Sequence, residues 1–250
     1  MKIKLIKNIR PESGFTQFLY VGLNVLLPIL VFVLVRLQFM PLAIILIFLA
    51  KWRMFTVKPR YWLANIRSNL VDIFVGLSIL SFMASTNNLI TQLIWTALYI
   101  VWLVWLKPQT KQVPVIIQAL IAQTISLIAF YQALPDAGVL ISIVAVWLIC
   151  FVSARHFLGV FDEQYIKQLA DLWAWFGAVM AWILSHWVIF YTNIPQIALI
   201  LTVISYGIGL IYYLQQNDRL KKAFKNQIII MVGIILLIII VFSDWQDKTI

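Results

Sequence analysis

Charged residues are scarce in this sequence. They make up 11% of its 250 residues, whereas 63% are hydrophobic and the mean hydropathy is +0.97. A soluble domain carries about 25% charged residues, so lipid must be the solvent for most of this chain. The bilayer core offers backbone groups no water, and only helices or a closed barrel can span it. Unbroken apolar runs such as 228–242 lack the alternation typical of barrel strands and therefore indicate helices.

The sequence also lacks the residues that several kinds of site require. Its one cysteine, Cys150, lies within an apolar run, which argues against a disulfide framework or a thiolate metal site. There is no phosphate-binding loop ending in Gly-Lys-Ser or Gly-Lys-Thr, no His-Glu-x-x-His zinc motif and no Gly-x-Ser-x-Gly turn. The two histidines, His156 and His186, fall at different depths, so they do not predict haem or zinc ligation. We expect no cofactor, no metal and no catalytic residue set.

Basic residues outnumber acidic ones by 19 to 9, which gives a net charge of +10. They form no single patch of the kind that binds nucleic acid, and a nucleic-acid partner is not expected. All but Arg36 and Lys248 fall in short clusters before residue 16 and at 51–67, 107–111, 155–167 and 219–225. The positive-inside rule places such clusters in the cytoplasm. We therefore expect a multi-pass protein of the inner (cytoplasmic) membrane, with the N-terminus inside, the C-terminus outside and membrane lipids as partners.

The apolar runs predict an all-α transmembrane bundle of about nine helices that forms one integral membrane domain over residues 1–250. The predicted helices cover residues 16–35, 39–50, 69–84, 89–106, 113–134, 139–154, 169–191, 196–214 and 227–242. The second is short, and the basic cluster after it requires the chain to return to the side on which it started. It either crosses the membrane fully or forms a re-entrant hairpin, and the sequence leaves both open.

Polar residues share one face around the start of the third predicted helix. Asn65, Asn69 and Asp72 recur there at three- and four-residue spacing. An acid inside a span is costly and usually faces the bundle interior or a wet cavity, and we expect Arg67 or Arg60 to pair with Asp72. A transport or catalytic role is one interpretation. We favour a structural one, in which the dipole of a nearby helix N-terminus stabilises the carboxylate.

The fifth and seventh predicted helices carry polar residues too. Asp171 is expected at about the depth of Asp72, and the two acids would form a shared cation or proton site if their helices were adjacent. A structural role at the start of the helix is again the simpler interpretation. Gln118 and Gln123 lie on a broad face with small residues, which is typical of interhelical hydrogen bonding in lipid.

Residues 58–72, Lys-Pro-Arg-Tyr-Trp-Leu-Ala-Asn-Ile-Arg-Ser-Asn-Leu-Val-Asp, resemble a segment of uncharacterised polytopic membrane proteins from ultrasmall candidate-phylum bacteria. That resemblance implies a membrane location and no particular activity. Three hypotheses for function remain. We favour a transporter or lipid-handling protein without its own ATPase. The alternatives are a non-catalytic membrane subunit, which would contact another protein through cytoplasmic segments 51–68 and 155–168, and a membrane-embedded lipid-modifying enzyme.

Overall fold

The computed structural model describes residues 14–52, 58–161, 163–185, 187–191 and 194–247. These residues form nine α-helices: α1 (Gly14–Arg36), α2 (Met40–Leu49), α3 (Trp62–Ala84), α4 (Leu89–Val101), α5 (Gln112–Ala133), α6 (Val139–Leu158), α7 (Ile166–Leu184), α8 (Gln196–Gln216) and α9 (Lys222–Phe242). A 3₁₀ turn, η2 (Pro59–Tyr61), precedes α3, and a π-helical turn, η3 (Trp102–Leu106), continues α4. The predicted all-α bundle is confirmed.

Five helical stretches are long and apolar enough to cross a membrane: Leu89–Leu106, Gln112–Ala133, Val139–Leu158, Gln196–Gln216 and Lys222–Phe242. The chain is therefore an integral, multi-pass membrane protein. Shorter apolar stretches lie in α1, α2 and α3. α2 has 10 residues and a length of about 15 Å, roughly half of a bilayer core of about 30 Å. The turn that precedes α2 nevertheless lies beside the α3–α4 connection, where Arg36 donates a hydrogen bond to the Asn87 carbonyl.

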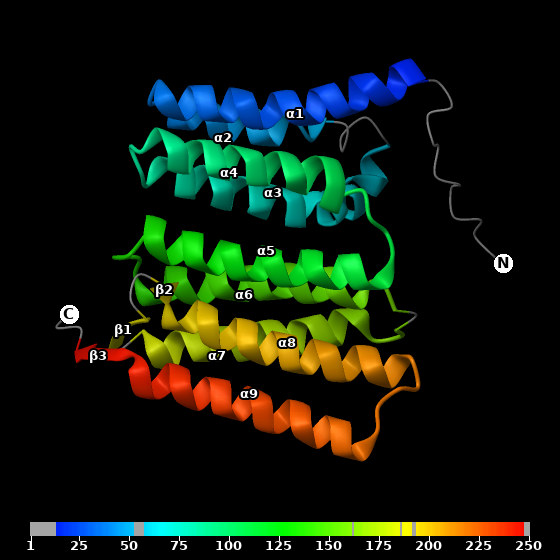
Figure 1. Cartoon of the computed structure of the whole chain (residues 1–250), viewed down its shortest axis with the longest axis vertical. Helices are drawn as coiled ribbons and strands as arrows, with labels where there is room; N and C mark the ends of the chain where they lie inside the picture. The colour runs from blue at the N-terminus through cyan, green and yellow to red at the C-terminus, as the bar shows by residue number, and fades with distance from the viewer. Residues whose placement is uncertain (1–13, 53–57, 162, 186, 192–193, 248–250) are drawn as a thin grey trace.

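Successive helices run in opposite directions, so their connections alternate between two ends of the bundle (Figure 1). The connections that follow α2, η3, α6 and α8 lie at one end, which we call the basic end. Basic side chains gather in these connections and the adjoining helix termini: Lys51, Lys107, Lys111, Arg155, Lys167, Arg219, Lys221, Lys222 and Lys225. Among the residues that the structure describes, the opposite end carries Arg36 as its only basic residue.

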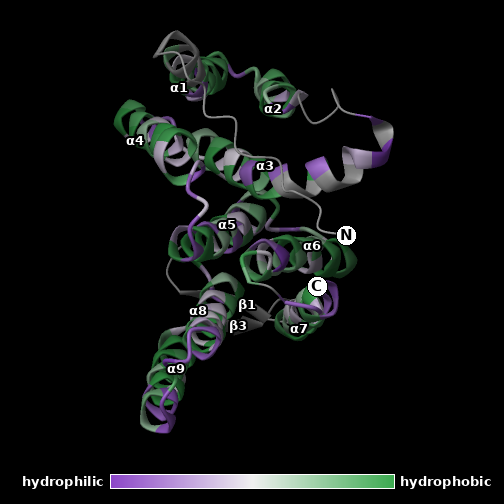
Figure 2. Ribbon diagram, turned by 90° about the vertical axis from the view of Figure 1, so that its right-hand side faces the viewer, coloured by the Kyte–Doolittle hydropathy of each residue, from purple (hydrophilic) through white to green (hydrophobic). Residues whose placement is uncertain are grey.

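The bundle has two halves that meet at α5, as the view along the helices shows (Figure 2). In the first half, α1 to α4 pack together around a core that includes Ile47, Met83 and Tyr99. In the second half, α5 to α8 surround a separate core that includes Leu127 and Leu201. α5 contacts α3 on one side and α6 and α8 on the other, while α9 packs on the outside of α8. Each half therefore has its own packing environment.

The seventh predicted helix, 169–191, is wrong in its C-terminal part. α7 ends at Leu184, and β1 (Trp187–Tyr191) pairs antiparallel with β2 (Ile194–Pro195) and β3 (Asp244–Asp247) in the order β2-β1-β3. β1 has the sequence Trp-Val-Ile-Phe-Tyr, and aromatic and β-branched residues favour strands. A short apolar run does not by itself distinguish a strand from a buried helix. The small sheet joins the segment after α9 to the α7–α8 connection.

α3 begins at Trp62, seven residues before the predicted start at residue 69. Asp72 therefore lies about three turns inside the helix. The field of a helix terminus falls off within its first turn, so the dipole does not account for this buried acid. Its partners in space must do so.

Small residues line the face of α7 that packs on α6. Ala174, Ala178 and Ala181 are buried, and α7 makes its most extensive contact with α6. A Cβ atom added to Gly177 would lie 2.7 Å from Cys150 Sγ on α6, so only glycine fits there without a shift. Small side chains let the two helices approach closely in the absence of a hydrophobic driving force between them.

Candidate functional site

Asp72 is the centre of a buried ion cluster near the basic end. Lys51 Nζ lies 2.9 Å and Lys107 Nζ 2.7 Å from the same oxygen, Asp72 Oδ2. Trp102 Nε1 donates a hydrogen bond of 3.2 Å to the other oxygen, Oδ1. The three donors come from the residues after α2, from η3 and from the turn after η3. The cluster therefore ties the segment before α3 and the segment at the end of α4 to α3, with both carboxylate oxygens engaged.

The π-helical turn explains how Trp102 and Lys107 reach one carboxylate. In an α-helix, residues five apart point about 140° away from each other. Here the Lys107 N–H donates to the Trp102 carbonyl over 2.8 Å, an i to i+5 bond that sets one residue above the other. Such π-helical turns are rare and often occur at functional sites. The turn is the local feature that completes the cluster.

Burial dominates the electrostatics of Lys51, which is 7% exposed and follows the end of α2. Loss of hydration lowers the pKa of its ammonium group to about 8, because attraction to Asp72 offsets only part of that loss and the nearby charge of Lys107 lowers it further. An ion cluster of this kind is costly to bury and even costlier to break. Its geometry is that of a structural clamp more than of an open ligand site.

The predicted partners of Asp72 were Arg67 and Arg60, but its observed partners are Lys51 and Lys107. Arg60 instead lies over the Tyr61 ring, with the guanidinium carbon 4.5 Å from the ring centre. The side chain of Arg67 lies outside the described part of the structure. Both lysines follow predicted helices at the same end as Asp72, a signal that was present in the sequence and was not used.

The other polar residues predicted for the site are two asparagines of α3, and Asp171 on α7. Asn69 Nδ2 donates to the Asn65 carbonyl at 2.9 Å within α3, toward the basic end. Asp171 is half-buried on α7, which packs mainly on α6. The charges that act on Asp72 are those of Lys51 and Lys107. The structure does not bring Asp171 to Asp72.

Gln118 links α5 to two other elements at the basic end. Its Nε2 donates to the Leu106 and Gln109 carbonyls at 2.6 and 3.2 Å, and its Oε1 lies 2.9 Å from His156 Nε2 on α6. His156 was not paired with any residue by sequence reasoning. A glutamine that bonds to both halves of the bundle fits the predicted role in interhelical hydrogen bonding.

Gln123 performs the same role deeper in the second half. Its Nε2 donates to Ser205 Oγ on α8 at 2.7 Å, and its Oε1 accepts from Trp173 Nε1 on α7 at 3.1 Å. Gln123 is 3% exposed, so these bonds lie in the interior of the bundle. Unlike Gln118, Gln123 borders an open space.

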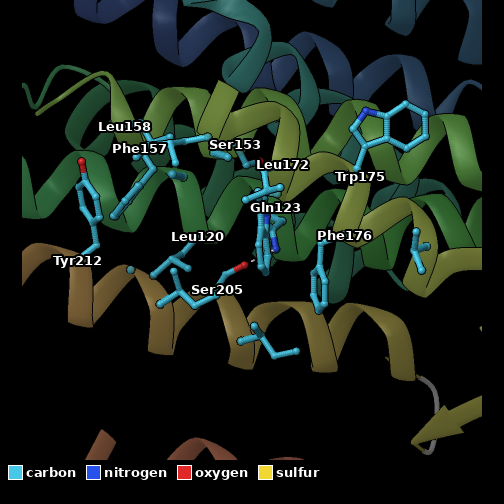
Figure 3. A pocket seen from close by; sticks show the side chains of 18 residues that line it. Leu120, Gln123, Ser153, Phe157, Leu158, Leu172, Trp175, Phe176, Ser205 and Tyr212 are labelled. Carbon is cyan, nitrogen blue, oxygen red and sulfur yellow. Dashed lines mark hydrogen bonds between the residues drawn. The ribbon is translucent and has the colours of Figure 1, made fainter. Parts of the chain in front are cut away.

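That space is a lateral cleft of about 720 Å³ among α5, α6, α7 and α8, in the half of these helices nearer the basic end. Figure 3 shows Leu120, Phe157 and Phe176 around it, with Gln123 and Ser205 turned toward each other. Leucine, isoleucine, valine, alanine and aromatic side chains form most of its wall, and the described lining includes no charged residue. Sequence reasoning missed this cleft.

A small polar group borders the cleft toward the basic end. Tyr212 on α8, which lines the cleft, donates a hydrogen bond to Glu163 Oε2 in the α6–α7 connection. This bond is the main cause that lowers the pKa of Glu163. The Tyr212 ring also packs edge-on against Phe157 and Phe161, with centroids 5.8 and 5.0 Å away. These aromatic rings thus lie between the apolar part of the cleft and the α6–α7 connection.

Neither candidate region gathers metal ligands. No group of three or more histidine, cysteine, aspartate or glutamate side chains with the geometry to hold a metal occurs among the residues described. Comparison with known proteins identified no relative: no family model matches the chain, no curated protein matches it, and no solved structure matches its fold. The resemblance of residues 58–72 to membrane proteins of ultrasmall bacteria stays a prediction. The fold and the geometry of its sites are therefore the basis for function.

Proposed function

We propose that this membrane protein handles lipids, and that the cleft among α5 to α8 holds the hydrocarbon chain of one lipid taken from the surrounding bilayer. The observation that carries the proposal is the cleft itself. Its volume of about 720 Å³ falls within the range of about 300–1,000 Å³ that is usual for ligand sites. Its wall is apolar and it opens sideways between membrane helices, where the available molecules are lipids.

The chemistry of the lining favours a lipid chain over a polar solute. A transport path for an ion or a sugar needs charged or multiply hydrogen-bonding groups along it, because such a solute loses its hydration in the membrane. The described lining of the cleft offers aromatic and aliphatic side chains instead. Asp72, the residue that sequence reasoning favoured for transport, is bonded to Lys51, Lys107 and Trp102 and does not line the cleft.

The proposed orientation has the basic end in the cytoplasm. The concentration of lysine and arginine at that end supports it, because the positive-inside rule orients membrane proteins by this asymmetry. Lys167, Arg219 and Lys222 are exposed there, so anionic lipid headgroups would be attracted to the same end as the cleft. The membrane would be the inner membrane of the cell.

A second candidate is a membrane subunit that docks through α9. Among the described helices, α8 is the one with which α9 makes extensive contact. In α9, 11% of the membrane span is buried, against 28–44% in the other four long spans. A partner helix would cover the exposed face of α9. Lipid would cover it equally well, so the cleft remains the stronger basis for function.

Native mass spectrometry of the gently extracted protein tests both candidates. We expect one lipid retained per chain, and its loss in Ile208→Trp, which fills the cleft from α8. Ile230→Trp, on the exposed face of α9, is the matched control and should retain the lipid. If no lipid is retained, or if both variants keep it, the cleft is not the binding site. A second polypeptide at fixed stoichiometry, lost in Ile230→Trp, would instead support the subunit.

A further inference from the structure

Most polar groups in the cleft are already used by the protein. Gln123 accepts a hydrogen bond from Trp173 and donates one to Ser205, and Tyr212 donates one to Glu163. Ser153 on α6 is different: it is 2% exposed, it lines the cleft, and its hydroxyl has no hydrogen-bond partner. A buried hydroxyl without a partner costs about 1–3 kcal/mol. Such a group in a cavity wall points to a ligand atom that would bond to it.

Ser205 on α8 offers a second donor at the same level of the cleft. Its oxygen accepts the Gln123 bond, and its own O–H has no acceptor among the described residues. Gly209 on α8 faces Phe157 on α6, since a Cβ atom on the glycine would lie 3.4 Å from that ring. Ser205 lies four residues before Gly209, and Ser153 lies four residues before Phe157. Because α6 and α8 run in the same direction, both hydroxyls lie one turn, about 6 Å, deeper than the Gly209–Phe157 contact.

We infer that the lipid in this cleft is a glycerolipid, whose acyl ester carbonyls accept hydrogen bonds from Ser153 and Ser205. This inference rests on the proposed lipid-handling function and specifies its ligand. Two neutral donors at one depth match the two neutral ester acceptors at the junction of glycerol and chains. The chains then occupy the apolar cleft, and the headgroup lies toward Tyr212 and the basic end.

The same atoms argue against other lipid classes. An isoprenoid chain has no acceptor within its hydrocarbon part, so it would leave both hydroxyls unsatisfied. A phosphate or sugar seated at the level of the serines would lack counter-charges or sufficient partners, because no charged side chain lines the described wall. The ester carbonyl is the lipid group that meets the donors without bringing a charge into the cleft.

The test compares two phosphatidylglycerols with the same chains, one ester-linked and one ether-linked. The ether lipid keeps the headgroup and hydrocarbon but lacks both carbonyls. Delipidated protein is titrated with each, and bound lipid is counted by native mass spectrometry. We expect the wild type to bind the ester lipid on the order of tenfold more tightly, as two hydrogen bonds would give. Ser153→Ala should lose about half of this preference on a logarithmic scale, and Ser153→Ala/Ser205→Ala should lose all of it.

The ether lipid separates the inference from the function on which it rests. It should bind to the wild type and to both serine variants equally, and it should be excluded by Ile208→Trp. Ser142→Ala, at a buried serine of α6 outside the cleft, should keep the full preference. Equal binding of ester and ether lipids by the wild type, with exclusion by Ile208→Trp intact, would overturn the glycerolipid inference alone. Absence of binding by either lipid would overturn the lipid-handling function as well.

Discussion

A cluster of charges around Asp72 lies in the first half of the bundle, whereas an open cleft bordered by neutral polar groups lies in the second. Asp72 and two lysines bond to one another in the first half. The polar groups at the cleft are the amide of Gln123 and hydroxyls such as that of Ser153. Charges are too costly to leave next to hydrocarbon, but a hydroxyl is not. In the function that we propose, the first half provides a fixed scaffold and the second half the ligand site.

The largest effect expected is that of neutralising Asp72. Asp72→Asn leaves buried Lys51 and half-buried Lys107 without their counter-charge and should lower the free energy of unfolding by about 3–5 kcal/mol. Asp171→Asn makes the same chemical change at a half-buried residue of α7 and should lower the free energy of unfolding by less than about 0.5 kcal/mol. Unfolding of the detergent-solubilised protein, followed by tryptophan fluorescence, measures both. Equal losses would show that the two halves do not differ in this way.

Close packing within the second half is tested by glycine substitutions. Gly177→Ala should destabilise the protein by about 1–3 kcal/mol, since the new methyl group would meet Cys150 at 2.7 Å. Gly233→Ala on α9 is the control, because nothing lies within 4 Å of its Cβ position, and it should be neutral or slightly stabilising. The unfolding midpoints of both variants check this. A tolerated Gly177→Ala would mean that α6 and α7 are less tightly joined.

The charge of Lys51 should make the stability of the first half depend on pH. Its pKa is lowered from 10.5 to about 8 in the folded protein, so between these values the unfolded state binds more protons. Stability should therefore rise as the pH increases from 8 toward 10.5, by at most about 1.4 kcal/mol per pH unit. Lys51→Met, which leaves Asp72 balanced by Lys107, should fold and lose this rise. A rise that persists in the variant would assign it to another group.

The smallest effect is expected at two helix ends, one in each half. Gln38 after α1 and Asp218 after α8 have φ of 61° and 54°. The Phe39 amide donates to the Leu34 carbonyl, and the Arg219 amide donates to the Leu214 carbonyl, as in the Schellman motif. Gln38→Gly should stabilise the protein by about 1 kcal/mol, and Asp218→Gly by less, because aspartate tolerates this conformation better. Thermal unfolding compares them, and a loss of stability in Gln38→Gly would contradict the assignment.

The helices could be predicted from the sequence because lipid demands long apolar runs, and a run such as 228–242 admits few other structures. The start of α3 was missed because residues 62–68 are polar for a span, although they continue the same helix. Trp187–Tyr191 was placed in a helix because its apolarity is satisfied equally by a strand, and its pairing with Asp244–Asp247 is a contact between distant parts of the chain.

The candidate sites were predictable only as single residues. Asp72 and Gln123 were named correctly as buried polar groups, since polarity inside a span is visible in sequence. The partners of Asp72 depend on a π-helical turn at Trp102–Leu106 that no composition signal marks. The cleft depends on where side chains fail to fill the space between α7 and α8, and Ser153 became notable only because its hydroxyl lacks a partner.

Photo-crosslinking with a lipid that carries a diazirine on its acyl chain tests the central claim most directly. After extraction and exchange into detergent, the retained lipid is activated and the labelled peptides are identified. The label should fall on cleft residues such as Leu172 and Ile208, should be removed by competition with unlabelled ester lipid, and should be absent from α1 and α2. Labelling spread evenly over the lipid-facing helices of both halves would contradict a lipid site in the second half.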